Sequence, residues 1–471
     1  MNIKKSEQSP LTEVPDWSDF SGGLIQGKTF SVVTFGCQMN KHDSERIVGM
    51  LSALGAREVN GIEESDIIIY VTCCVREAAD VRLMGQVASL KNVPLRKDSP
   101  VSKRVVVIGG CIGQRDGQEL VEKLPHVDVV FGTFNLASLP RLIEESLQSG
   151  SHAVEVLSEA KDFPTDLPSE RESKWSAWLP ISIGCNNFCT YCIVPYVRGR
   201  EKSRSIEDIV SDARRLKEDG VKEITLLGQN VNSYGRDLYK EPRFADLLRE
   251  VSATGIERIR FATSHPKDLN DDVIKAFGEL DNLMPALHLP VQSGSNAILK
   301  AMNRRYTREH YLETIQKLRA VRPDIALSTD IIVGFPGETE EDFQQTYDLI
   351  KEVGYHQVFT FIYSKREGTP AARWVDDTPR EVIQERFERL VDLVQENALA
   401  VNQPELDTTV KVLVEGVSKR DPNVLAGRSP KNQTVHAPIP QGARIEDLEG
   451  SVVDVHITQA RAWYLKGDVL S

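Results

Sequence analysis

The sequence predicts an α/β protein with three folded parts: an amino-terminal parallel β-sheet, a partial βα-barrel, and a small β-barrel at the carboxyl end. Three observations lead to this prediction. Apolar runs alternate with helix-like polar segments over residues 28–150, and the same alternation recurs over the longer span 175–402. From residue 403 to residue 471 the runs become short and alternating, with Gly and Pro turns between them, which is typical of a small β-barrel.

The segments outside these parts lack the pattern of a folded element. Residues 1–27 are acidic and have no apolar signal-peptide core, so we expect a poorly ordered tail. Residues 151–174 contain prolines, serines and mixed charge, so we expect a linker. No stretch approaches the roughly eighteen apolar residues of a membrane span, and 7 Cys in 471 residues are too few for a disulfide scaffold. These features predict a cytoplasmic protein.

The formal net charge of -12 excludes a protein coated in basic surface, so any nucleic-acid contact must be local. Two groups of basic residues are candidates for phosphate contacts, and for each the alternative is an ordinary solvated surface. One group follows a Cys-rich loop and the other lies in the carboxy-terminal part: Arg198, Arg200, Lys202 and Arg204, and Lys419, Arg420, Arg428 and Lys431.

In the amino-terminal part, each apolar run is followed within a few residues by a cysteine. The runs are residues 30–35, 66–71 and 104–108, apolar at nearly every position, which predicts parallel strands covered on both faces. Because the carboxyl ends of such strands share one edge, we expect Cys37, Cys73 and Cys111 to meet there and form a metal site. The alternatives are ordinary buried thiols, and Cys74 in place of Cys73 as a ligand.

Three more cysteines, Cys185, Cys189 and Cys192, lie in a C-x3-C-x2-C spacing after an apolar run. A four-iron cluster normally takes four Cys ligands, so a triplet leaves one iron open. A zinc knuckle is the alternative, but structural zinc is four-coordinate, and no His or further Cys lies within about thirty residues. The spacing resembles that of the radical S-adenosylmethionine (SAM) enzymes, in which the open iron binds SAM.

Residues 175–402 contain six candidate strands, which predicts an incomplete βα-barrel. The catalytic groups of βα-barrels lie beyond the carboxyl ends of the strands. The loops at these positions are polar and rich in Gly, and together they ring the predicted mouth, although each one alone would be an ordinary turn. We expect a shell for SAM and substrate formed by Gln229, Asn230, Gln292, Ser293, Gly334 and Glu338. Alternatively, Glu338 is only an acid in the first turn of a helix.

Longer strings extend the resemblance to nearly the whole chain after the tail. They span residues 34–40, 72–77, 110–111, 184–200 and 287–294. With both thiol sets in view, the sequence resembles the radical SAM methylthiotransferases, and most closely those that act on tRNA. The Asn-Asn-Phe between Cys185 and Cys189 favours this group over relatives acting on ribosomal protein S12 or on threonylcarbamoyl-adenosine. The sequence departs from the usual pattern at Val71 and at Cys74, which places a spare thiol beside the expected cluster.

The resemblance implies a flavodoxin-like amino-terminal domain, a radical SAM barrel and a terminal TRAM domain that binds tRNA. It also implies two 4Fe-4S clusters. By motif, the SAM cluster is held by Cys185, Cys189 and Cys192, and the auxiliary cluster by Cys37, Cys73 and Cys111.

The implied reaction converts N6-isopentenyladenosine at position 37 of tRNA, next to the anticodon, into its 2-methylthio derivative. No protein acid, base or nucleophile is suited to an unactivated C–H bond, so a radical cofactor is required. The resemblance implies that SAM supplies a 5′-deoxyadenosyl radical, that the auxiliary cluster supplies sulfur methylated by a first SAM, and that two SAM molecules are used per turnover. Both clusters must then face one pocket, and the target base must leave the anticodon loop to reach it.

The implied partners are the tRNA anticodon loop carrying isopentenyladenosine, a reducing electron donor and iron–sulfur assembly proteins, with no membrane. We expect a monomer. Two rival functions remain open. One is methylthiolation of threonylcarbamoyl-adenosine in tRNA or of ribosomal protein S12. The other is a non-catalytic iron–sulfur or zinc protein that binds nucleic acid.

Overall fold

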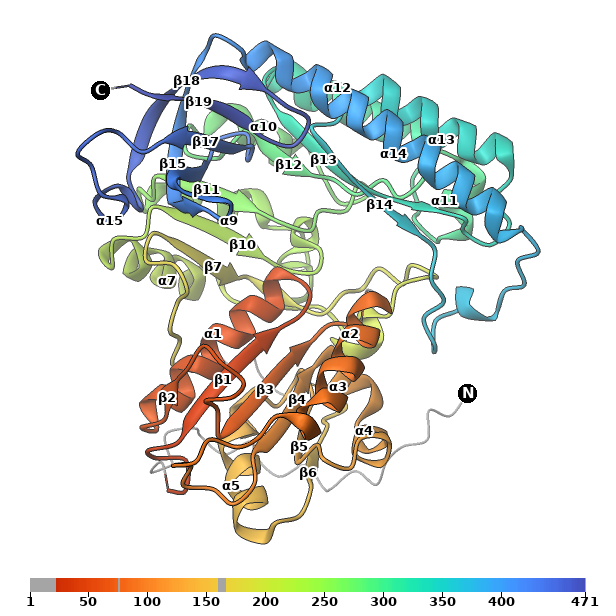
Figure 1. The fold of residues 1–471 in the computed structure, drawn as a ribbon. Coiled ribbons are helices and arrows are strands. Elements are labelled where there is room, and N and C mark those ends of the chain that lie inside the picture. The colour runs from red at the N-terminus through yellow and green to blue at the C-terminus, as the bar shows by residue number, and fades with distance from the viewer. Residues whose placement is uncertain (1–22, 75–76, 160–166, 471) are drawn as a thin grey trace. The chain divides into compact units, whose positions relative to one another are not determined.

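The structure is a computed structural model that describes residues 23–74, 77–159 and 167–470 (Figure 1). This part of the chain divides into two compact units. The first unit comprises the residues up to 172 together with 183–186 and 192–202, and the second comprises 173–182, 187–191 and 203 onwards. Residues 1–22 of the expected tail and 160–166 of the expected linker lie outside the described residues. Within the described part, no helix is long and apolar enough to cross a membrane.

The first unit contains a six-stranded sheet in the order β2-β1-β3-β4-β5-β6, with every neighbouring pair parallel. Its strands are β1 (Thr29–Thr34), β2 (Arg57–Glu58), β3 (Ile67–Thr72), β4 (Val105–Gly110), β5 (Val129–Phe131) and β6 (Ala153–Glu155). The order confirms the predicted flavodoxin-like sheet, in which the chain visits β2 on one side of β1 and then crosses to β3 on the other. Strand β6 comes from the segment expected to be a linker.

Helices cover both faces of this sheet, as Figure 1 shows, and this explains why its strands are apolar at nearly every position. One core packs α1 and α5 against alternate strand residues such as Ile67 and Ile69, and it also contains Ile25 from the expected tail. The other core packs α2 and α4 against the intervening Ile68 and Ile108. The helices of this unit are α1 (Gln38–Ala53), α2 (Glu77–Ser89), α3 (Cys111–Asp116), α4 (Gln118–Lys123), α5 (Leu139–Ser149) and α6 (Val194–Val197).

The second unit contains the six predicted barrel strands, divided into two parallel three-stranded sheets. Their orders are β11-β10-β7 and β12-β13-β14, and a single parallel bridge joins Ile259 to Leu283, just before β12. The strands are β7 (Ser176–Pro180), β10 (Glu223–Leu227), β11 (Arg258–Phe261), β12 (Ala286–His288), β13 (Ala326–Val333) and β14 (Gln357–Ile362). The arrangement is the incomplete βα-barrel that the sequence predicted.

Most helices of the second unit follow the strands in alternation and bury their apolar stripes against the sheets. They are α7 (Ile206–Glu218), α8 (Arg236–Tyr239), α9 (Phe244–Ala253), α10 (Asp271–Glu279), α11 (Asn296–Ala301), α12 (Arg308–Val321), α13 (Glu340–Val353) and the long α14 (Arg380–Asn402). The Ser205 hydroxyl accepts from the Asp208 amide at the start of α7, and a complete reciprocal capping box occurs at Thr339 and Asp342 of α13.

A closed five-stranded barrel, ordered β15-β16-β17-β19-β18, ends the chain. Its elements are β15 (Thr409–Ser418), β16 (Asp421–Arg428), β17 (Thr434–Pro438), α15 (Ile445–Leu448), β18 (Val452–Ala460) and β19 (Leu465–Val469). Two arginines of β11 hold this barrel. Arg260 donates to the carbonyls of Ser429 and Pro430, at 2.8 and 2.9 Å, and Arg258 donates to the Arg428 carbonyl at 3.0 Å. The predicted small β-barrel is confirmed.

Candidate iron–sulfur and SAM site

The three strand-end cysteines of the first unit lie where the sequence placed them. Cys37 follows β1, Cys73 follows β3, and Cys111 follows β4. Strands β1 and β3 are neighbours although the chain visits β2 between them, and ligands bind parallel sheets at such a reversal of strand order. The Cys37 thiol is hydrogen-bonded to Cys73, and the Cys111 thiol to Cys74. Four thiols are therefore gathered at the carboxyl end of this sheet.

Close backbone approach makes this gathering possible. Gly36 has a φ of 109°, and a Cβ atom added there would lie 2.2 Å from Cβ of Cys73. Only glycine fits at a position with both constraints. Cys73, Cys74 and Cys111 are buried, and Cys37 is partly exposed.

A buried arginine accompanies these thiols. The Arg198 side chain is hydrogen-bonded to Cys111, and its Nη2 donates to Oδ1 of Asn40 at 2.7 Å and lies 3.2 Å from Oδ2 of Asp43. The hydrogen bond with Cys73, and then the Arg198 charge, lower the pKa of Cys37 to about 6 against the opposing effect of burial. The side chain of Arg198 is therefore an internal counter-charge for this thiol set.

The thiol pKa values of Cys111 and Cys74 are shifted in opposite directions. The hydrogen bond with Cys74, assisted by the charge of Arg198, lowers the pKa of Cys111 to about 7, although burial opposes the shift. The same hydrogen bond, together with burial, raises the pKa of Cys74. Cys74 therefore stays protonated, and its S–H group donates a hydrogen bond to Cys111.

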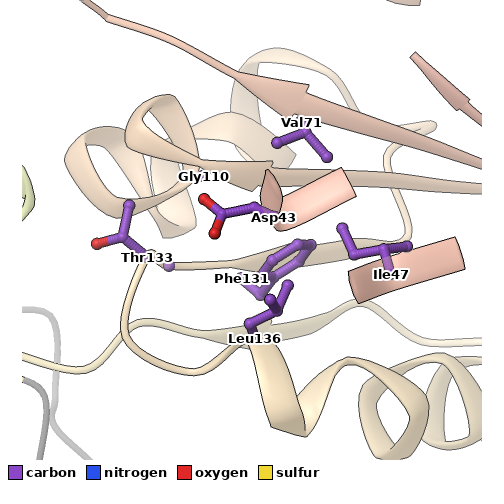
Figure 2. Close-up of a pocket in the computed structure, with 8 residues that line it drawn as sticks. Asp43, Ile47, Val71, Gly110, Phe131, Thr133 and Leu136 are labelled. Carbon is purple, nitrogen blue, oxygen red and sulfur yellow. The ribbon is translucent and has the colours of Figure 1, made fainter. Parts of the chain in front are cut away.

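A pocket lies beside this site, between α1 and the carboxyl ends of β3, β4 and β5 (Figure 2). Asp43, the partner of Arg198, is one of its lining residues. Figure 2 shows the Asp43 carboxylate near Gly110, with the Phe131 ring below it. The rest of the lining is largely apolar, which keeps the Asp43–Arg198 pair in surroundings that strengthen its attraction.

The donor set of the first unit fits an iron–sulfur cluster. Such clusters are held by Cys thiolates, and the site offers thiols of which two already ionise near or below neutral pH. Among the described residues, no three His, Cys, Asp or Glu side chains are arranged to hold a single metal ion. Ligands of a cluster stand further apart than those of one ion, because each binds a different iron.

The Cys triplet loop runs through both units. In the first unit, the Cys185 amide donates to the Gly199 carbonyl at 3.0 Å. In the second unit, residues 187–191 are fastened to the end of α11: the Thr190 hydroxyl donates to the Ala301 carbonyl at 2.9 Å, and Nδ2 of Asn303 donates to the Phe188 carbonyl at 2.8 Å. The loop that presents Cys189 is therefore held by side chains distant in sequence.

Arg304 lies directly against Cys189. Its Nη1 donates to Sγ of Cys189 at 3.6 Å, its Nη2 donates to the Pro290 carbonyl at 2.6 Å, and its Nε donates to the Tyr306 hydroxyl at 3.0 Å. Arg304 is 5% exposed, so this guanidinium belongs to the interior of the second unit.

A second anchor of the same loop is Asp268, which is 4% exposed and follows β11. Its Oδ2 accepts from Nδ2 of Asn230 at 2.7 Å and from Nδ2 of Asn187 at 3.3 Å. Its Oδ1 lies 3.2 Å from Nη2 of Arg236, and Nζ of Lys267 donates to Oδ1 of Asn187 at 2.5 Å. This carboxylate therefore ties a residue of the Cys loop to the carboxyl ends of two barrel strands.

The residues of the predicted SAM shell differ in their burial and in their contacts. Asn230 and Gln292 are buried beyond the ends of β10 and β12, and Gln292 holds a positive φ of 73°, while Gln229 is partly exposed. The Ser293 hydroxyl is fully buried and bonded to Oγ1 of Thr346 at 3.2 Å. This hydroxyl serves the packing of helix α13 in the structure. As SAM ligands, these residues stay a prediction.

Glu338 is likewise occupied within the fold. Its Oε2 accepts from the Gly334 amide at 2.8 Å and lies 3.7 Å from Nη1 of Arg386. Burial raises the pKa of Glu338 to about 7, although the Gly334 amide and Arg386 oppose the shift. Glu338 precedes the capping residue of α13, so the alternative of an acid at the start of a helix describes its position.

The prediction that basic residues after the Cys loop reach phosphates is wrong for two of the four. Arg198 and Arg204 are each 5% exposed, and Arg204 pairs with Asp212 at 2.7 Å. Only Arg200 is exposed, and Lys202 is partly exposed.

The basic group of the terminal barrel also divides. Lys431 pairs with the buried Glu405 at 2.6 Å, and Arg428 lies 3.5 Å from Glu415 at the surface, so each has a nearby carboxylate. Lys419 and Arg420 are exposed at the turn between β15 and β16. These two residues carry the remaining candidate phosphate contact.

Comparisons with known proteins agree with this architecture. Three family models match: "Uncharacterized protein family UPF0004" over residues 29–132, "Radical SAM superfamily" over 179–350, and "TRAM domain" over 406–470. A tRNA-2-methylthio-N(6)-dimethylallyladenosine synthase from Thermoanaerobacter sp. (strain X514) is 46% identical over 444 residues, 94% of this chain and 92% of the relative. The synthase of the same name from Alkaliphilus oremlandii is 47% identical over 448 residues, 94% of this chain and 93% of the relative.

The chain belongs to the tRNA-2-methylthio-N(6)-dimethylallyladenosine synthase family of radical SAM methylthiotransferases. A relative in this family from Geobacillus kaustophilus, 44% identical, matches all of this chain and 88% of its own length. Among solved structures, the radical SAM methyltransferase TsrM from Kitasatospora setae, with cobalamin and a [4Fe-4S] cluster bound, superposes with a TM-score of 0.52. That match has 13% sequence identity, covers 73% of this chain and 77% of TsrM, and supports the fold alone.

Sequence reasoning missed three side chains that contact the candidate cluster ligands or their loop in this structure: Arg304, Asp268 and Arg198. Asp268 lies beyond the carboxyl end of β11, where polar loops were expected, so its position on the barrel was available from the pattern. Nothing local distinguishes Arg304 from its exposed neighbour Arg305. The Cys189 sulfur and the Pro290 carbonyl, which bind Arg304, come from other loops, and such long-range contacts leave no periodic pattern in the sequence.

Proposed function

We propose that this protein converts N6-dimethylallyladenosine (N6-isopentenyladenosine) at position 37 of tRNA, next to the anticodon, into its 2-methylthio derivative. The relatives that match over 94% of the chain are named as synthases of this nucleoside. The observation that carries the proposal is the gathering of Cys37, Cys73 and Cys111 at the carboxyl ends of neighbouring strands, because this family requires a thiolate set separate from the SAM triplet.

The proposal assigns two 4Fe-4S clusters to the chain. Cys185, Cys189 and Cys192 would hold the cluster that binds SAM, and Cys37, Cys73 and Cys111 would hold the auxiliary cluster. When bound, these groups supply one-electron chemistry for removing an unactivated hydrogen, and sulfur for insertion at the same carbon, with two SAM molecules per turnover.

The protein's own residues hold this machinery in place. Arg198 places a positive charge beside the auxiliary thiols and so favours their thiolate forms, which are the forms that bind iron. The Asp268 carboxylate orients Asn187, and Asn303 fixes Phe188, so that the loop carrying Cys189 keeps one conformation. The buried polar groups beyond β10 and β12, Asn230 and Gln292, are the proposed contacts for SAM and substrate.

Recognition of tRNA is assigned to the terminal barrel, which the TRAM model matches. Lys419 and Arg420, exposed at the β15–β16 turn, are the proposed phosphate contacts, and Arg200 is a third. The target adenine must leave the anticodon loop to reach buried groups. A reducing electron donor and iron–sulfur assembly proteins are the further partners, and we propose a monomer in the cytoplasm.

The first experiment is mass spectrometry of tRNA nucleosides from a strain lacking the gene. We expect 2-methylthio-N6-isopentenyladenosine to disappear and N6-isopentenyladenosine to accumulate. Loss of a methylthiolated threonylcarbamoyl-adenosine, or of the modification on ribosomal protein S12, would instead assign the chain to one of the rival substrates. Unchanged nucleosides and unchanged S12 would leave the non-catalytic protein as the better description.

The second experiment tests the division of labour between the thiol sets. Anaerobically reconstituted protein should bind about eight irons per chain and release 5′-deoxyadenosine on reduction with SAM. Cys185→Ala should abolish this release, whereas Cys111→Ala should lose about four irons, keep the release and stop sulfur insertion. Cys74→Ala is the matched control, because it removes a neighbouring buried thiol outside the proposed ligand set. Equal loss of SAM cleavage in the Cys185 and Cys111 variants would contradict the assignment.

A further inference from the structure

Arg304 is a buried cation that contacts a proposed cluster ligand. Only one of its three hydrogen bonds reaches a group that becomes an anion when it binds iron, the Cys189 sulfur at 3.6 Å. The other two partners are neutral oxygens, the Pro290 carbonyl and the Tyr306 hydroxyl. The guanidinium stays protonated even when it is buried, so its charge needs a partner.

The usual partner of a buried arginine is a carboxylate, and three of the other four buried arginines of the second unit have one, whereas the fourth, Arg258, donates to the Arg428 and Lys411 carbonyls. Arg204 pairs with Asp212, Arg260 with Glu223, and Arg386 with Glu340. Across the described ranges of the chain, no carboxylate forms an ion pair with Arg304. As the thiolate ligand of a cluster, the Cys189 sulfur would be the counter-charge of Arg304, and removal of either partner would leave the other uncompensated.

We propose that Arg304 sets the reduction potential of the SAM cluster through its hydrogen bond to Cys189. This inference rests on the proposed cluster at Cys185, Cys189 and Cys192. Reduction adds an electron to the cluster and its thiolate ligands, so a buried cation bonded to one ligand sulfur stabilises the reduced form more than the oxidised form. Hydrogen bonds to sulfur and net charge are two of the known determinants of cluster potential. Arg304 touches no reacting atom in this scheme and acts as a positioning residue.

The surrounding loop holds Arg304 in this geometry. The Tyr306 hydroxyl accepts from Nε of Arg304 and donates to the Val291 carbonyl at 2.7 Å. The residues on either side, Asn303 and Arg305, both have positive φ angles, 57° and 58°. Asn adopts such angles readily just after a helix, whereas arginine does so rarely. On this turn Arg304 is buried and Arg305 is exposed.

The test compares Arg304→Gln and Arg304→Lys with Arg305→Gln, in full-length, anaerobically reconstituted protein. Arg305 is the matched control because it is the adjacent arginine and is exposed. The measurement is a redox titration followed by electron paramagnetic resonance, on the signal that changes when SAM is added. Iron content per chain is measured for each variant at the same time.

For Arg304→Gln we expect the ratio of reduced to oxidised SAM cluster, at a fixed solution potential, to fall about tenfold, which is about 59 mV for one electron. Arg304→Lys keeps the charge but loses the planar fork of donors, so its ratio should fall less. Arg305→Gln should match the wild type. An unchanged ratio in Arg304→Gln with full iron content would overturn the inference.

Two further outcomes are decided in advance. If Arg304→Gln does not load the SAM cluster, Arg304→Lys decides: a loaded cluster with a lowered ratio supports the inference. If neither variant loads it while the auxiliary iron is retained, Arg304 has a structural role and the inference fails. A wild-type protein without any SAM-sensitive signal would instead refute the proposed function, which is a separate and distinguishable result.

Discussion

Replacing Arg260 with methionine should release the terminal barrel from the core of the second unit. Arg260 is 8% exposed, and two of its hydrogen bonds cross to the barrel, to the carbonyls of Ser429 and Pro430. A hydrogen bond from a charged donor contributes about 1.5–3 kcal/mol, so two of them contribute at least about 3 kcal/mol to docking. Since each 1.4 kcal/mol is a factor of ten, the undocked population should rise about 100-fold.

Limited proteolysis under native conditions measures this population. At low protease concentration the cleavage rate follows the equilibrium fraction of the open form. The expected cut lies between α14 and β15, near residues 403–408, and it releases the barrel as a fragment identifiable by mass spectrometry. Arg249→Met is the matched control. Arg249 forms a half-exposed ion pair with Glu279, worth at most about 1 kcal/mol, so cleavage should rise no more than about fivefold.

A double variant separates the two causes that Arg260→Met combines. Arg260 also pairs with the buried Glu223 at 2.9 Å, so its removal strands a carboxylate. In Arg260→Met combined with Glu223→Gln the stranded charge is gone but the two carbonyl contacts are still missing. We expect cleavage to stay near 100-fold above the wild type. Cleavage within about fivefold of the wild type in Arg260→Met itself would refute the docking role of this arginine.

Two further predictions concern the thiol sites. Gly184→Ala should lower the iron content of the reconstituted protein by about four per chain, because φ at this residue is 74° and a Cβ atom would lie 2.1 Å from the Arg200 carbonyl oxygen. In metal-free protein, alkylation of Cys37 followed by mass spectrometry should be half-maximal near pH 6, because the hydrogen bond with Cys73 and the Arg198 charge lower its thiol pKa to about 6. The thiolate reacts and the thiol does not, so Arg198→Gln should move this midpoint to higher pH, and an unmoved midpoint would contradict the role of Arg198.

The fold was predictable because its determinants are local. The runs at 66–71 and 104–108 are apolar at every position after the first, and the observed strands β3 and β4 differ from them by one or two residues. The strand-end cysteines could be placed together because parallel strands share an edge, which is a rule of topology. The sequence could not decide between Cys73 and Cys74 as the ligand, because both lie in the same turn. In the structure each of them is hydrogen-bonded to another thiol of the site, Cys73 to Cys37 and Cys74 to Cys111.

The charged residues of the site could not be predicted, for a physical reason. Charged side chains are rarely buried without a partner, so Arg198 and Arg204 in a polar segment were expected at the surface. Their partners, Asp43 and Asp212, come from helices α1 and α7, and only the folded chain brings them near. Glu338 was expected in the SAM shell because its loop follows a barrel strand, and its contact with Arg386, which lies far along the chain, could not be foreseen.

The two buried arginines that contact thiols place different net charges beside them. Arg198 shares its charge with Asp43, 3.2 Å away, whereas Arg304 has no carboxylate partner within the described residues. The surroundings of Cys189 are therefore more positive, by about one charge, than they would be with a partner like that of Arg198. A positive environment favours the reduced state of a cluster. In the proposed scheme, a cluster held by Cys185, Cys189 and Cys192 would therefore be easier to reduce than a cluster held by Cys37, Cys73 and Cys111.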